Sequence, residues 1–124
     1  MSATRSTVQR DPRYTMPPFM EAYVEFRYPN SSGRRLSMPL LDISVAGLSF
    51  AAGSGLPLIV RGARIEGVVV LLGDIRMEGK LLIMHATAGG PSGVAYGAVF
   101  YPATEQDQLR LNGVIAGLAS RTGS

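Results

Sequence analysis

The sequence has no cysteine, and His85 is its one histidine. Without cysteine the chain can form neither a disulfide nor a thiolate metal site, and a reducing compartment is permitted. A metal centre or a catalytic pair built on histidine needs a partner residue, and no second histidine is present to provide one. We therefore interpret His85 as a structural or partly exposed residue at the end of a strand, in preference to a metal ligand or a general base.

Long apolar segments are also missing. The longest uninterrupted apolar run, Val68–Leu72, has five residues, whereas a membrane-spanning helix needs roughly 20. The N-terminal segment 1–14 carries arginines among polar residues and lacks the apolar core of a secretory signal. We expect no membrane insertion and no export by that route, and therefore a soluble cytoplasmic protein.

Charge is sparse, at 17% of the residues, with a formal net charge of +3 and a pI near 9.7. This excess favours an anionic partner, but it is too small to indicate a nucleic acid polymer.

Hydrolase patterns are absent as well: there is no phosphate-binding loop, and Asp42 replaces the first glycine that a nucleophile elbow around Ser44 would need. We expect a protein that is not an enzyme and that carries no cofactor and no metal.

Alternating side chains indicate a mainly β fold. Residues Glu21–Tyr28 alternate between two sides with a period of two, which is typical of a half-buried strand. The Pro29–Gly33 segment has the residue types of a turn, so we expect a hairpin partner to begin near Arg34. The same reasoning predicts strands at 34–42, 48–52, 64–72, 75–86 and 94–101.

The C-terminal segment 104–119 has the pattern of an amphipathic helix. Thr104 can cap its first turn, with Asp107 three residues later in a variant of the capping box. Four apolar residues then share one helical face: Leu111, Val114, Ile115 and Leu118. We expect this helix to lie against a β-barrel or to close one of its ends. The length of the chain fits a single domain.

One compact group of polar residues lies between two predicted strands. It comprises Asp42, Ser44 and Gly47, and a segment with Arg10 and Arg13 precedes it. A carboxylate can accept hydrogen bonds from the donor edge of guanine, a hydroxyl can donate and accept, and arginine can bind phosphate or stack on a base. Such a set suits a guanine nucleotide held without cleavage. It is also compatible with ordinary turn chemistry and solvated surface arginines.

The order of these features resembles the PilZ family over residues 9–119. That family has an Arg-x-x-x-Arg segment, a strand hairpin, an Asp/Asn-x-Ser-x-x-Gly motif, further barrel strands and a C-terminal helix. Asp42, Ser44 and Gly47 match the second motif in full. Further similar positions are Leu48–Phe50, Gly62 and Tyr96–Phe100. The resemblance implies a small six- or seven-stranded antiparallel β-barrel with a C-terminal α-helix, spanning 15–120 after a flexible segment at 1–14.

The resemblance also implies a ligand. In the family, the arginine segment clamps the bacterial second messenger cyclic di-GMP (c-di-GMP) against the barrel. Here the implied contacts would come from Arg10 and Arg13 to phosphate and guanine, from Asp42 and Ser44 to a guanine edge, and from Gly47 by close approach. The protein would then act as a receptor or adaptor for an unidentified bacterial protein partner, as a monomer or homodimer.

One position departs from the family pattern. If Arg13 takes the place of the second family arginine, the first falls on Gln9, and Arg10 lies one residue away. In an extended segment one residue reverses the direction of the side chain. The alternative hypothesis is therefore a PilZ-like module with weak or no nucleotide binding, which acts through protein contacts, for example in motility or pilus assembly.

Overall fold

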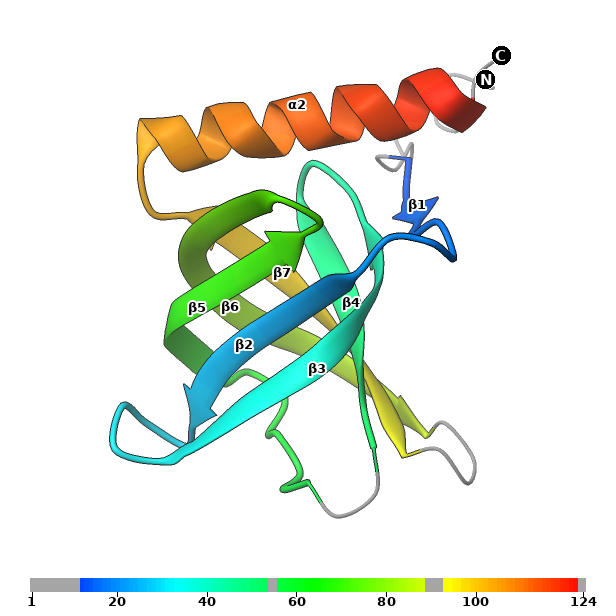
Figure 1. Cartoon of the computed structure of the whole chain (residues 1–124). Helices are drawn as coiled ribbons and strands as arrows, with labels where there is room; N and C mark the ends of the chain where they lie inside the picture. Colours follow the sequence, from blue (N-terminus) through cyan, green and yellow to red (C-terminus); the bar gives the residue numbers. More distant parts are fainter. Residues whose placement is uncertain (1–11, 54–55, 89–92, 123–124) are drawn as a thin grey trace, which may run out of the picture.

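A computed structural model describes residues 12–53, 56–88 and 93–122. Its strands form one antiparallel sheet in the order β1-β3-β2-β5-β6-β7-β4. Because β3 also pairs with β4, strands β2 to β7 close into a barrel, and the short strand β1 lies outside it (Figure 1). The elements are β1 (Tyr14–Thr15), β2 (Ala22–Tyr28), β3 (Arg34–Ile43), β4 (Gly47–Ala52), β5 (Arg64–Leu72), β6 (Ile75–Ala88), β7 (Val94–Pro102) and α2 (Glu105–Thr122).

The predicted fold class, an antiparallel β-barrel with a C-terminal helix, is confirmed. Each predicted strand agrees with an observed barrel strand to within two residues at either end. Helix α2 ends at Thr122 rather than at residue 119. Strand β1 was not expected, because two residues are too few to show a period.

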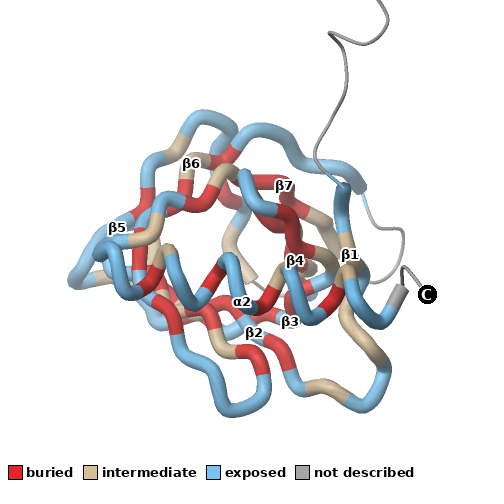
Figure 2. Tube along the Cα trace, turned by 90° about the horizontal axis from the view of Figure 1, so that it is seen from above, coloured by how far each residue is buried: buried red, intermediate tan, exposed pale blue. Residues whose placement is uncertain are grey.

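Alternating side chains fill the barrel interior. Buried and exposed residues alternate along much of the barrel strands (Figure 2), and the buried ones form one core. Three aromatic residues from different strands meet there: the rings of Phe26 and Phe50 lie 5.9 Å apart and those of Phe50 and Tyr96 5.5 Å apart. The Tyr96 hydroxyl accepts a hydrogen bond from the Ile59 N–H at 2.9 Å. This bond ties the connection between β4 and β5 to the core.

Helix α2 lies across one end of the barrel (Figure 1). Leu111, Val114 and Leu118 are buried, and Ile115 is partly buried against the same core. The face predicted from helical spacing is therefore the face that covers the barrel.

The first turn of α2 is joined to the barrel through Asp107. The Asp107 N–H donates to the Thr104 hydroxyl at 3.1 Å, and that hydroxyl donates to the Asp107 carboxylate at 2.7 Å. The other carboxylate oxygen accepts the N–H of Glu78 on β6 at 3.1 Å. The predicted helix cap is thus present, and the same side chain that completes it fixes the helix to the sheet.

Candidate ligand-binding site

Strand β1 holds Arg13 next to Asp42. In the pairing of β1 with β3, Thr15 lies opposite Asp42. Arg13, two residues before Thr15, therefore reaches Asp42 from a diagonal position on the same face of the sheet. The Arg13 Nε donates to Asp42 Oδ1 at 2.8 Å, and its Nη2 lies 2.7 Å from the same oxygen. The side chains remain 48% and 26% exposed, so a ligand in solution can reach both.

A β-bulge turns Asp42 toward the outside of the barrel. Between Leu40 and Asp42 the pairing advances two residues on β3 but one on β4, so Leu41 is an extra residue. Leu40 is buried before the bulge and Ile43 is buried after it. Because side chains in a strand alternate with a period of two, an uninterrupted strand would have directed Asp42 into the core. The bulge therefore places the carboxylate where Arg13 can meet it.

Ser44 lies in the turn between β3 and β4 and is buried, with 2% of its surface exposed. Its N–H donates to the Gly47 carbonyl at 2.8 Å, and its hydroxyl donates to the same carbonyl at 3.3 Å. The hydroxyl also accepts the N–H groups of Ala46 and Gly47 at 3.3 and 3.2 Å. Ser44 thus has the turn chemistry that was one of the alternatives for it, whereas the Asp42 carboxylate bonds to the distant Arg13.

Gly47 is required by the close approach of β7. A Cβ atom at this position would lie 2.2 Å from the carbonyl oxygen of Ala98. The backbone of Gly47 is not in the positive-φ region. Steric contact with the neighbouring strand, rather than turn geometry, therefore accounts for glycine at this position of the motif.

A shallow pocket of about 250 Å³ opens beside the ion pair. Its floor is formed by β4 and β7, where Gly47 lies opposite Val99, and Ser49 lies opposite Gly97. These residues face outward, since the residues between them on both strands are buried in the core. No side chain projects from Gly47 or Gly97, and both glycines are themselves buried, Gly97 beneath the His85 ring.

Met84 and His85 of β6 form the side of the pocket opposite Arg13. A second bulge leaves Met84 as an extra residue in the pairing of β6 with β7, and both side chains are exposed. The His85 ring covers Gly97: a Cβ there would lie 2.3 Å from both the Cε1 and Nε2 atoms of the imidazole. His85 is therefore partly exposed as expected, but it lies within β6 rather than at the end of the strand.

No local pattern in the sequence indicates that Met84 and His85 lie beside the motif residues. Gly97, in the middle of the last predicted strand, was the available signal, because glycine inside a strand often marks a close approach by another group. Of the predicted site residues, Arg13 and Gly47 line the pocket, Asp42 is bonded to Arg13, and Ser44 occupies the adjoining turn. Arg10, Gln9 and most of segment 1–14 lie outside the described residues.

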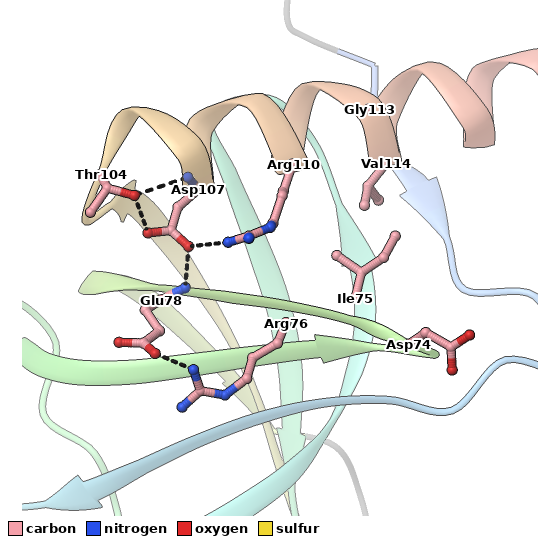
Figure 3. Close-up of a pocket in the computed structure, with 9 residues that line it drawn as sticks. All are labelled: Asp74, Ile75, Arg76, Glu78, Thr104, Asp107, Arg110, Gly113 and Val114. Atoms are coloured by element: carbon pink, nitrogen blue, oxygen red, sulfur yellow. Dashed lines mark hydrogen bonds and ion pairs between the residues drawn. The ribbon is translucent and has the colours of Figure 1, made fainter.

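Another pocket, of about 700 Å³, lies between α2 and the start of β6 (Figure 3). Two arginines line it, and both are paired: Arg76 with Glu78, and Arg110 with Asp107 at 3.5 Å. Asp74 adds a third carboxylate to the lining. With carboxylates in excess and both guanidinium groups engaged, this pocket suits an anionic ligand less well than the one at Arg13.

A metal-binding group and a membrane-spanning helix are both absent from the described part of the chain. None of these residues form a group of three or more histidine or acidic side chains that could hold a metal ion. No helix within them combines the length and the apolar character needed to cross a membrane.

The fold of this chain matches the folds of solved structures. The PilZ domain of Escherichia coli YcgR, determined with c-di-GMP, superposes with a TM-score of 0.70 over 92% of this chain and 93% of that chain, at 14% sequence identity. The chain has the PilZ fold. The resemblance inferred from the order of the sequence features is therefore confirmed at the level of the fold.

Other structures with the PilZ fold are longer than this chain. MrkH from K. pneumonia, in complex with c-di-GMP, gives a TM-score of 0.78 over 93% of this chain and 54% of that chain, at 19% identity. The Bacillus subtilis inhibitor of motility MotI/DgrA gives 0.70 over 94% and 55%, at 11% identity. This chain thus spans about half the length of those two proteins. No protein-family model and no curated protein matches the sequence.

Proposed function

We propose that this protein is a non-catalytic receptor for c-di-GMP in bacterial signalling. The observation that carries the proposal is the position of Arg13 and Asp42, which a PilZ barrel presents together on its outer surface, beside a shallow pocket. Two proteins with the same fold, YcgR and MrkH, have been solved with c-di-GMP. The pocket offers the guanidinium group of Arg13, to which the Asp42 carboxylate is bonded, and a floor of small residues.

The chemistry of the pocket suits a cyclic dinucleotide. The guanidinium of Arg13 can contact a phosphate through two N–H groups or stack on a base. The Asp42 carboxylate holds Arg13 in place and has further lone pairs for the N–H donors of a guanine edge. Gly47 lines the pocket without a side chain, and close approach of the ligand to it stays a prediction. Ser44 serves the site by holding the turn, and a contact from its hydroxyl to guanine stays a prediction.

Arg10 belongs to the proposal as a second contact to phosphate. It lies three residues before Arg13, and a ligand bound at Arg13 would be within reach of a segment of that length. Gln9, which replaces the first arginine of the family pattern, offers no charge. We therefore expect an affinity below that of a site with two well-placed arginines, by roughly one to two orders of magnitude for the loss of one charge-assisted contact.

Isothermal titration calorimetry with c-di-GMP tests the proposal. We expect saturable binding of c-di-GMP and a rise in the melting temperature of the protein, because a ligand that binds only the folded state stabilises it. Cyclic di-AMP serves as the matched control, since it has the same phosphate ring but lacks the guanine edge. Absence of heat and of a thermal shift at hundreds of micromolar c-di-GMP would show that the protein is not such a receptor.

One observation favours the second candidate, a protein-interaction module with weak or no nucleotide binding. Each motif residue has a structural role without a ligand: Asp42 pairs with Arg13, Ser44 builds its turn, and Gly47 fits against β7. The motif would therefore persist in a chain that had lost the ligand. Affinity capture of partner proteins with and without c-di-GMP separates the two, because only the receptor should bind its partner in a nucleotide-dependent way.

We further propose that the protein acts in the cytoplasm. There it would act on a bacterial protein partner, as a monomer or a homodimer. Light scattering at several protein concentrations, with and without c-di-GMP, measures the oligomeric state. A mass that changes on addition of the nucleotide would show that assembly is part of the response.

A further inference from the structure

We propose that His85 and Met84 form a second contact surface for the ligand, opposite Arg13, and that His85 stacks on one of its guanine bases. This inference rests on the proposed function, because it assigns the guanine base of c-di-GMP to a particular side of the pocket. His85 and Met84 belong neither to the arginine segment nor to the motif of Asp42, Ser44 and Gly47.

The pocket itself places His85 and Arg13 on one ligand-sized surface. Both residues line it, together with Gly47 and with Gly97, over which the His85 ring lies. Going across the sheet, the order is β3, β4, β7 and β6, so the floor on β4 and β7 separates the Arg13–Asp42 pair from His85. A ligand that touches Arg13 and lies along the floor is therefore directed toward the β6 side.

Two bulges give this surface its side chains. The bulge in β3 turns Asp42 outward, and the bulge in β6 makes Met84 an extra residue before His85; both are exposed, as are the three residues that follow them. Without the bulge, His85 would lie two residues after the buried Ile83 on the same face and would be directed toward the core. Bulges commonly re-aim side chains at functional sites. Here both of them act at the edges of the same pocket.

Gly97 sets the position of the His85 ring. The imidazole lies directly over this glycine, in the space that a Cβ atom would fill. Since Gly97 is not in a positive-φ conformation, its backbone would accept another residue, and the visible role of the glycine is to make room for the ring. The ring is thus held close to the sheet at the edge of the floor.

The chemistry of the two side chains fits a base rather than a phosphate. Imidazole is among the aromatic groups on which nucleic acid bases stack, and every base offers a π-face for such stacking. The Met84 thioether is flexible and polarizable and packs well against an aromatic ring edge. Met84 is 45% exposed, so its side chain is accessible to a bound ligand.

The first test measures the affinity for c-di-GMP of the native chain, His85→Ala and His85→Phe by calorimetry. Loss of one stacked base is expected to weaken binding about fivefold to a hundredfold in His85→Ala. His85→Phe keeps an aromatic face and should retain most of the affinity. Tyr23→Ala is the matched control, because it removes an exposed aromatic side chain from β2, outside the pocket.

A second test uses Gly97→Ala, alone and together with His85→Ala. The added methyl group must displace the ring, which can move because it is the end of a side chain. We expect Gly97→Ala to lower the affinity in the native background and to have little further effect once His85 is alanine. Equal losses in both backgrounds would mean that the methyl group blocks the ligand directly, and that His85 is not the contact.

The outcomes distinguish this inference from the proposed function. If the native chain binds c-di-GMP and His85→Ala binds equally well, the stacking role is wrong and the receptor function stands. If the native chain does not bind, the proposed function is wrong and the inference falls with it. A thermal melt of each variant separates loss of contact from loss of folding.

Discussion

Arg13 and Asp42 are 29 positions apart in the sequence, and two guanidinium nitrogens of Arg13 lie within 2.8 Å of a single oxygen of Asp42. The pair forms because β1 docks on the edge of β3, and because the bulge at Leu41 directs the carboxylate outward. An exposed ion pair contributes only about 0–1 kcal/mol to stability. The pair therefore contributes little to the stability of the fold, and its contribution to ligand binding can be measured separately.

Arg13→Ala and Asp42→Ala are each expected to weaken binding of c-di-GMP by about tenfold to a hundredfold, because each removes a charge-assisted contact. Calorimetry gives the affinity, and chemical denaturation should show little change in stability. The matched control is Arg35→Ala, which breaks the exposed pair with Glu25 on β2. Unchanged affinity in both pocket variants would mean that the ligand, if bound, lies elsewhere.

Gln9→Arg is expected to strengthen binding of c-di-GMP, because it restores the spacing of two arginines that the family pattern has. The gain should reach about tenfold if the new side chain makes one charge-assisted contact to phosphate. Gln106→Arg, at an exposed position of α2, adds the same charge away from the pocket and should have a much smaller effect. Equal effects of the two variants would point to general electrostatic attraction instead.

Two glycines should respond in opposite ways to alanine. At Gly47 the new methyl group would lie 2.2 Å from the backbone oxygen of Ala98, which cannot move aside without opening the pairing of β4 and β7. We expect a loss of about 1–3 kcal/mol in the free energy of unfolding. At Gly113 on α2 there is open space, and alanine should stabilise the helix by about 0.5–1 kcal/mol. Urea denaturation measures both.

Asp107 should make stability depend on acidity. The hydroxyl of Thr104 donates to its carboxylate and holds its pKa below the usual value of 3.8; burial opposes this shift, and the Glu78 N–H and Arg110 add to it. A carboxyl whose pKa is lowered in the folded state stabilises the fold fully at pH values above 3.8, and this contribution is lost as the pH falls through the lowered value.

Asp107→Asn is therefore expected to lower stability at neutral pH, by roughly 1 kcal/mol for the weakened cap. It should also make the loss of stability in acid less steep, since the titrating group is gone. Unfolding by urea at neutral pH and below pH 3.8 gives the comparison. Glu105→Gln, an exposed carboxylate in the same helical turn, is the control. A pH profile unaltered by Asp107→Asn would assign the acid sensitivity to other groups.

The strands and the helix could be predicted because their signals are local. Alternation along Glu21–Tyr28 and the helical spacing of Leu111, Val114 and Leu118 depend on the period of each element, which neighbouring residues reveal without the rest of the chain. Thr104 and Asp107 likewise form a cap within a single turn. The motif around Asp42 could be found for the same reason, as a short pattern in one segment.

Other features required the closed barrel. Asp42 points outward only because the pairing of β3 with β4 contains an extra residue, and Gly47 is needed only because β7 passes close by. No local pattern distinguishes His85 from other strand residues. The pairing of β6 with β7 places it over Gly97, in the pocket that Arg13 also lines. The elements could be predicted from local periodicity, and the motif from a short pattern within one segment. Which side chains meet was decided by strand register, which depends on contacts between residues far apart in the chain.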